Sequence, residues 1–134
     1  MRTSRGSLVV LLFYSLVVFV SPDFAQGNNS GFVLPPDPGK AGKESLLGID
    51  TDGDGVRDDI QRYIYFTYPD DKKLRLGLTY YAIEFQGVLK DANDREAAYD
   101  HANKMARHGE CLFYLKGEDS IDIRRALRAK ILNT

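Results

Sequence analysis

Residues 70–90 read DDKKLRLGLTYYAIEFQGVLK, and the spacing of the apolar residues in this stretch decides the fold class. The apolar positions recur at steps of three and four residues, at Leu74, Leu78, Tyr81, Phe85 and Leu89. This period matches the turn of an α-helix, so these side chains form one stripe along its side. The stripe predicts a helix from about Asp70 to Lys90 that faces a core.

A shorter helix is expected on the N-terminal side of this stretch. Asp58 and Asp59 stand where acidic side chains complement the exposed N–H groups of a helix start. The apolar side would consist of Ile60, Tyr63, Ile64 and Thr67. Pro69 pushes the residue before it out of the helical region, so this helix is expected to end near Tyr68. Residues 41–49 are expected to form one short turn of helix before it.

Two further helices are predicted on the C-terminal side. The first begins after Asn93, which with Glu96 resembles a capping box, and runs to about Leu115. Its expected inner face is Ala98, Ala102, Met105, Leu112 and Leu115. The second starts near Asp119 or Ser120, with an apolar side of Ile123, Ala126, Leu127 and Ile131. No alternating strand pattern is present, so residues 46–134 are predicted to be an all-α domain, a small bundle of three to four helices.

Residues 50–61, DTDGDGVRDDIQ, place carboxylates at alternate positions before a glycine. A hard divalent cation is held by oxygen ligands from a tightly curled loop with this spacing. The expected metal ligands are Asp50, Asp52, Asp54, the backbone carbonyl of Val56, Asp58 and Gln61. Gly55 stands at the sixth place, where the chain must turn with a positive φ. Because every candidate donor is an oxygen, the pattern favours calcium over zinc. Magnesium would demand a stricter octahedron and keep more of its waters.

The twelfth place of the loop departs from the calcium pattern. Glutamate there would supply two oxygens, whereas Gln61 has one neutral carbonyl. A weak site is therefore expected, with a Kd of about 10⁻⁴–10⁻³ M. Asp59 is a substitute ligand if the backbone deviates. The alternative interpretation is a solvated acidic turn that caps the following helix, since aspartate and glycine are ordinary turn residues.

This stretch resembles the DxDxDG calcium loops of thrombospondin type 3 repeats, dockerins and EF-hand-like exported bacterial proteins. The resemblance covers residues 50–61. Residues 48–64, GIDTDGDGVRDDIQRYI, are also similar to a segment of small, uncharacterised exported bacterial proteins in which the loop precedes a helix. The resemblance implies that a structural calcium ion is the cofactor.

The N-terminus has the features of a secretory signal peptide over residues 1–25. Arg2 and Arg5 precede an uncharged apolar run from Leu8 to Val20, which is short for a membrane span. An uncleaved N-terminal anchor is the alternative. Residues 26–45 are rich in proline and glycine and predict a flexible leader. The protein is thus expected to be secreted or periplasmic, with no stable membrane span after cleavage.

Charge and the remaining polar residues limit the classes of function. The net charge of −1 provides no basic field for nucleic acid. His108 and Cys111 are three residues apart, but no further zinc ligands and no oxyanion-stabilising loop are evident, so no enzyme is predicted. Cys111, the only cysteine, is expected to be buried. A disulfide with another chain is the other interpretation.

The sequence therefore predicts a small exported calcium-binding module with a structural or interaction role. Its partner would be an envelope or extracellular protein. The alternative is a calcium-independent protein-interaction domain that uses the aromatic faces of its helices, because tyrosine is numerous and is favoured at interfaces.

Overall fold

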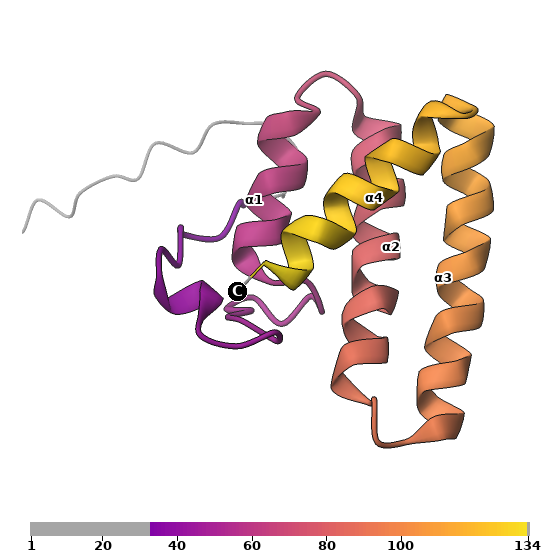
Figure 1. The fold of residues 1–134 in the computed structure, drawn as a ribbon. Coiled ribbons are helices and arrows are strands. Elements are labelled where there is room, and N and C mark those ends of the chain that lie inside the picture. Colours follow the sequence, from indigo (N-terminus) through magenta and orange to yellow (C-terminus); the bar gives the residue numbers. More distant parts are fainter. Residues whose placement is uncertain (1–32, 134) are drawn as a thin grey trace, which may run out of the picture. The chain divides into compact units, whose positions relative to one another are not determined.

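The computed structural model describes residues 33–133, which form four α-helices and one turn of 3-10 helix, with no β-strand among them (Figure 1). The elements are η1 (Ala41–Lys43), α1 (Asp58–Thr67), α2 (Lys72–Lys90), α3 (Arg95–Lys116) and α4 (Asp119–Leu132). The predicted all-α class is confirmed. The predicted signal peptide, residues 1–25, and the first part of the predicted leader lie outside the described residues.

The helices pack around α2. Helices α2 and α3 lie side by side and run in opposite directions, joined by a short turn (Figure 1). Helix α4 then runs back across α2 and ends beside α1. The C-terminal end of α4 is thereby close to the loop that precedes α1, which brings residues more than seventy positions apart in sequence into contact.

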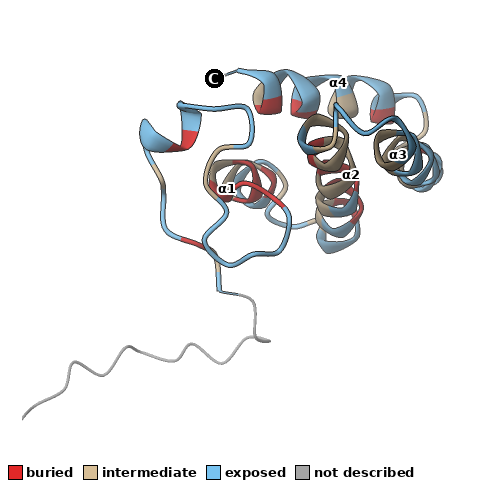
Figure 2. Ribbon diagram, turned by 90° about the horizontal axis from the view of Figure 1, so that it is seen from below, coloured by how far each residue is buried: buried red, intermediate tan, exposed pale blue. Residues whose placement is uncertain are grey.

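The core lies where α1, α2 and α4 face one another, with one residue from α3, and the buried positions mark these facing sides (Figure 2). Its apolar members are Val56, Ile60, Ile64, Leu74, Leu78, Tyr81, Ala82, Leu112, Leu127 and Ile131. The stripe predicted for residues 70–90 supplies four of these ten residues if its neighbour Ala82 is included. Phe85 and Leu89, further along that stripe, are half-buried and pack against the cluster.

Helix α3 buries less of its surface than the sequence predicts. Of the expected inner face, Leu112 is buried and the other four residues are only half-buried. Helix α3 packs against α2 and the start of α4, so one narrow stripe of its surface is covered. Two other residues that were expected to be buried are exposed. Cys111, next to Leu112, is exposed and not buried, and Ala126 on α4 is exposed.

The start of α3 differs from the prediction by one residue. The N-cap is Asp94, whose side chain accepts hydrogen bonds from the backbone N–H groups of Glu96 and Ala97 at 3.0 and 3.1 Å. Asn93 was predicted in this role and lies in the preceding turn. Aspartate and asparagine are similarly good caps, so composition alone does not distinguish two adjacent candidates.

We expect Asp94→Ala to lower the free energy of unfolding by about 1 kcal/mol, because two N–H groups of the first turn lose their acceptor. Asn93→Ala is the matched control and should change it by less than about 0.5 kcal/mol. Urea unfolding followed by circular dichroism measures both. Equal effects of the two substitutions would contradict the assignment of the cap.

The described part of the predicted leader contacts the helical domain. Pro35 is buried, and its carbonyl accepts a hydrogen bond of 2.9 Å from the guanidinium of Arg62 on α1. Gly42 in η1 is also buried and lies against Pro38. The helical turn expected somewhere in residues 41–49 is η1, which occupies Ala41–Lys43. This segment therefore forms one wall beside α1.

Candidate metal centre

The loop of residues 50–57 curls around the side chain of Asp50. Its two carboxylate oxygens accept hydrogen bonds from the backbone N–H groups of Gly53, at 2.8 Å, and Gly55, at 3.0 Å. Gly55 has a φ of +88°, as expected for the sixth place of the loop, a conformation that residues with a Cβ rarely adopt. The N–H of Asp58 donates to the carbonyl of Ile49 at 2.8 Å and closes the loop where α1 begins.

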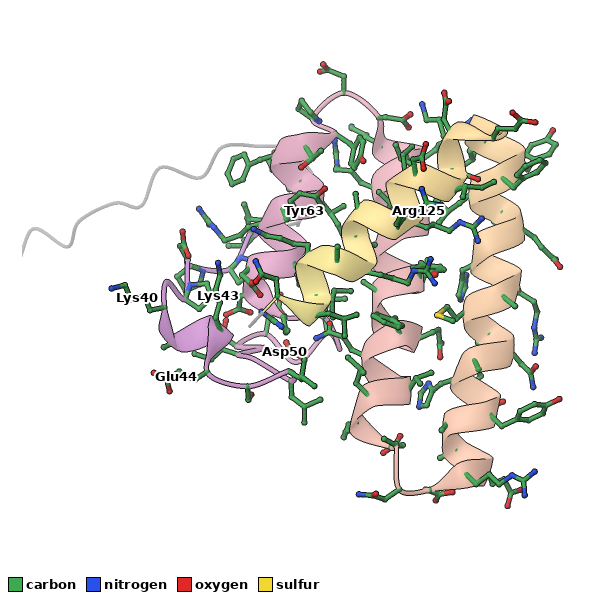
Figure 3. All side chains as sticks on the ribbon, in the orientation of Figure 1. Lys40, Lys43, Glu44, Asp50, Tyr63 and Arg125 are labelled. Atoms are coloured by element: carbon green, nitrogen blue, oxygen red, sulfur yellow. The ribbon has the colours of Figure 1, made fainter. Side chains whose placement is uncertain are left out.

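Three of the predicted ligands converge. Asp50, Asp52 and Asp58 each contribute one carboxylate oxygen, and these three oxygens all lie within 4.8 Å of one another. Calcium binds oxygens at about 2.3–2.6 Å, so two ligands of one ion lie no more than about 5 Å apart. This acidic cluster could hold a metal ion. Figure 3 shows Asp50 on the loop below α1, at the surface of the domain.

Asp58 anchors this cluster to the fold. It is buried at the start of α1, whereas Asp50 and Asp52 are exposed. Its two oxygens accept hydrogen bonds from the backbone N–H and the hydroxyl of Thr51, both at 2.9 Å. The cluster therefore has one fixed buried oxygen ligand and two that face solvent, from which an ion could enter.

Asp54 and Gln61, two further predicted ligands, contact each other. The Gln61 amide nitrogen donates to Asp54 Oδ2 at 2.5 Å and to Asp52 Oδ2 at 3.4 Å. Burial raises the pKa of the Asp54 carboxyl, and the nearby charges of Asp52 and Asp50 raise it further. The charged form of Asp54 is thus disfavoured, and a bound cation would reverse that effect.

The amide oxygen of Gln61 has no hydrogen-bond partner among the described residues, although the residue is only 4% exposed. Leaving a buried polar atom unpaired costs about 1–3 kcal/mol. A rotation of the amide by about 180° exchanges its oxygen and nitrogen and would bring the oxygen to Asp52 and Asp54. An oxygen in that position would repel the carboxylates unless a cation lay among them and the side chains moved slightly apart. The unpaired amide oxygen beside the carboxylates is therefore compatible with a bound metal ion.

Val56, predicted to contribute its backbone carbonyl, also joins the loop to the core. Its side chain is fully buried, and its N–H donates to Asp54 Oδ1 at 2.8 Å. The position next to it, Gly55, lies against Ile83 of α2. One end of the acidic loop is thus held against α1 and α2, while Asp50 and Asp52 stay at the surface.

Arg57 is the main feature that sequence reasoning missed. Its side chain is fully buried, and its guanidinium forms two hydrogen bonds of 2.9 Å with the carboxylate of Asp59. It also donates to the carbonyls of Leu46, at 3.2 Å, and Ile131, at 2.9 Å. Asp59, considered above as a substitute ligand, thus binds Arg57 and lies outside the acidic cluster. The only sequence signal is the place of Arg57 between core residues.

The other polar candidates lie on α2 and α3. The ring of His108 stacks on Tyr80, with centroids 5.4 Å apart, and forms no ion pair in the described part of the chain. His101 contacts two carboxylates, Glu84 at 2.7 Å and Asp91 at 3.2 Å. No sequence pattern indicates this bridge, since Glu84 lies on α2, Asp91 in the turn after it and His101 on α3. It joins α3 to α2 and to the turn between them.

Comparisons with known proteins give no identification, since no protein-family model, no curated protein and no solved structure matches the chain. Function is therefore argued from the loop itself. Within residues 33–133, no helix combines the length and the apolar composition that crossing a lipid bilayer requires.

Proposed function

We propose that residues 50–61 bind one calcium ion and that the chain is a small exported module stabilised by it. The observation that carries the proposal is the convergence of Asp50, Asp52 and Asp58 within 4.8 Å, beside an amide oxygen of Gln61 that has no partner within residues 33–133. Asp54 and the carbonyl of Val56 complete the proposed ligand set. The resemblance to thrombospondin type 3 and EF-hand-like loops supports the same assignment.

The choice of calcium rests on the chemistry of the donors. All the proposed ligands are oxygens, and no histidine or thiol belongs to the acidic cluster. Zinc in proteins is usually bound by those softer donors. Magnesium requires a smaller, stricter octahedron and keeps several of its waters, whereas calcium accepts irregular sets of six to eight oxygens.

The proposed role of the ion is structural. It would neutralise carboxylates whose mutual repulsion opposes the curled loop, and so stabilise the start of α1. Arg57 is the last residue before α1 and contacts the end of α4, so order in the loop would extend to the C-terminal helix. No catalytic role is proposed. An envelope or extracellular protein is the proposed partner, consistent with the predicted signal peptide.

Asp52→Ala combined with Asp54→Ala should abolish the calcium-dependent rise in melting temperature. At a calcium concentration about 100-fold above Kd, binding stabilises the native protein by about 2.7 kcal/mol, and the double variant should lose this gain. Differential scanning calorimetry in calcium and in chelator measures it. Glu110→Ala combined with Glu118→Ala, which removes two exposed carboxylates elsewhere, should keep the full calcium response. An unchanged response in the loop variant would count against the proposed ligands.

A calcium-independent protein-interaction domain is the second candidate. Helix α3 exposes three aromatic side chains, Tyr99, Phe113 and Tyr114, which are 69%, 50% and 89% accessible. Exposed aromatic residues are typical of interface anchors. Folding and partner capture that are the same in calcium and in chelator would favour this candidate over the first.

A further inference from the structure

A cleft of about 660 Å³ lies on the side of α1 near η1 and the end of α4. Its walls include Lys40 and Lys43 from the η1 segment, Arg62, Tyr63 and Phe66 from α1, and Lys130 from α4. Figure 3 labels three of these residues, Lys40 and Lys43 on the η1 segment and Tyr63 on α1. The volume is within the range of about 300–1,000 Å³ that small-molecule sites occupy. The acidic cluster does not line this cleft.

The charge of the cleft is positive. Four cationic side chains line it, against the two carboxylates of Asp37 and Asp59. Asp59 is neutralised by the buried Arg57, and Asp37 accepts a hydrogen bond from the N–H of Gly39 at 2.9 Å. Within residues 33–133, Lys40 and Lys43 form no ion pair. The cleft therefore offers unpaired ammonium groups in a chain whose net charge is −1.

Aromatic rings alternate with these cations. Lys130 Nζ lies 5.7 Å from the centroid of the Tyr63 ring, and Arg62 Cζ lies 5.3 Å from that of Phe66. The Phe66 side chain is 61% exposed although it stands beside the cleft. Arg62 is held in place by its bond to the Pro35 carbonyl. A ligand bound in the cleft would therefore contact both aromatic rings and cationic groups.

We propose that this cleft binds a small anion attached to a ring with an apolar face, and that a carboxylated or sulfated sugar is its ligand class. The anionic group would pair with Lys40 and Lys43, as charge-assisted hydrogen bonds to ammonium groups favour. The C–H face of the sugar ring would pack against the exposed part of the Phe66 ring, which otherwise contacts water. A nucleoside monophosphate shares this chemistry and is the second source to test.

The test is calorimetric titration of the full chain in calcium with glucuronate, glucose, inorganic sulfate and adenosine monophosphate. We expect glucuronate to bind with a Kd of about 1 mM or below, and glucose and sulfate to bind at least about tenfold more weakly. Lys40→Gln combined with Lys43→Gln should weaken glucuronate binding about tenfold. Lys72→Gln combined with Lys73→Gln makes the same charge change at exposed positions outside the cleft and should leave binding unchanged.

The comparison of probes identifies the source of the ligand. Tighter binding of adenosine monophosphate than of glucuronate would support the anionic-ring site and assign it to nucleotides. Binding of sulfate as tight as that of glucuronate would overturn the proposal, because the rings would then contribute nothing. No binding of either ringed anion, or equal loss in the two lysine variants, would overturn it as well. The Asp52→Ala and Asp54→Ala variant should still bind glucuronate, so this outcome is independent of the calcium proposal.

Discussion

Arg57→Met is expected to lower the free energy of unfolding by about 3–5 kcal/mol. The substitution keeps much of the side-chain volume but removes the guanidinium. It leaves the Asp59 carboxylate, whose side chain is 12% exposed, without its counter-ion. It also removes the donor that links the carbonyls of Leu46 and Ile131. Both losses leave polar groups unpaired in the interior.

Chemical denaturation of the variant measures this effect, and Arg128→Met, at an exposed position of α4, is the matched control. The control should change stability by less than about 0.5 kcal/mol. Adding Asp59→Asn to Arg57→Met removes the stranded charge, so the double variant should be more stable than the single one. A loss below about 1 kcal/mol in Arg57→Met would show that the buried guanidinium does not hold these segments together.

Gly48→Ala should lower stability by about 3 kcal/mol for two separate reasons. Gly48 has a φ of +58°, where a residue with a Cβ is strained by about 1–2 kcal/mol. A Cβ there would also stand 2.5 Å from Arg57 Nε and 2.7 Å from its Cδ, so the buried side chain would have to move. Overpacking of this kind typically costs about 1–3 kcal/mol.

Gly39 provides a control for the backbone term. It has the same φ of +58°, but a Cβ at this position would have no neighbour within 4 Å. Gly39→Ala should therefore lower stability by only about 1 kcal/mol in the same unfolding experiment. In an Arg57→Ala background the collision at Gly48 is relieved, and the two glycine substitutions should have similar effects. If Gly48→Ala and Gly39→Ala lowered stability equally in the wild-type background, the close contact between position 48 and Arg57 would be contradicted.

The fold was predictable from the sequence because its helices have a strong local signal. Leu74, Leu78 and Tyr81, which recur at the helical period, are all buried in the core. The predictions of burial that were wrong concern a helix with few neighbours. Helix α3 has the same kind of apolar spacing, but it covers little beyond α2, so Cys111 is exposed. No pattern within one helix reports the width of its covered face.

The acidic cluster was only partly predictable for a related reason. The alternate spacing of aspartates indicated the cluster, and the positive φ of Gly55 is found where the loop pattern needs it. The role of Arg57 depends on the C-terminal end of α4, which is distant in sequence. The bridge from His101 to Glu84 and Asp91 likewise joins two helices. Pairings of this range are fixed by packing and leave no local signature.

Isothermal titration of the purified protein with calcium chloride tests the central claim most directly. The proposed loop predicts a saturable heat with one ion per chain and a Kd of about 10⁻⁴–10⁻³ M, lost when Asp52 and Asp54 are replaced by alanine. The absence of any binding heat at millimolar calcium, together with an unchanged melting temperature, would contradict it. The carboxylates around Asp50 would then be only a solvated turn before α1.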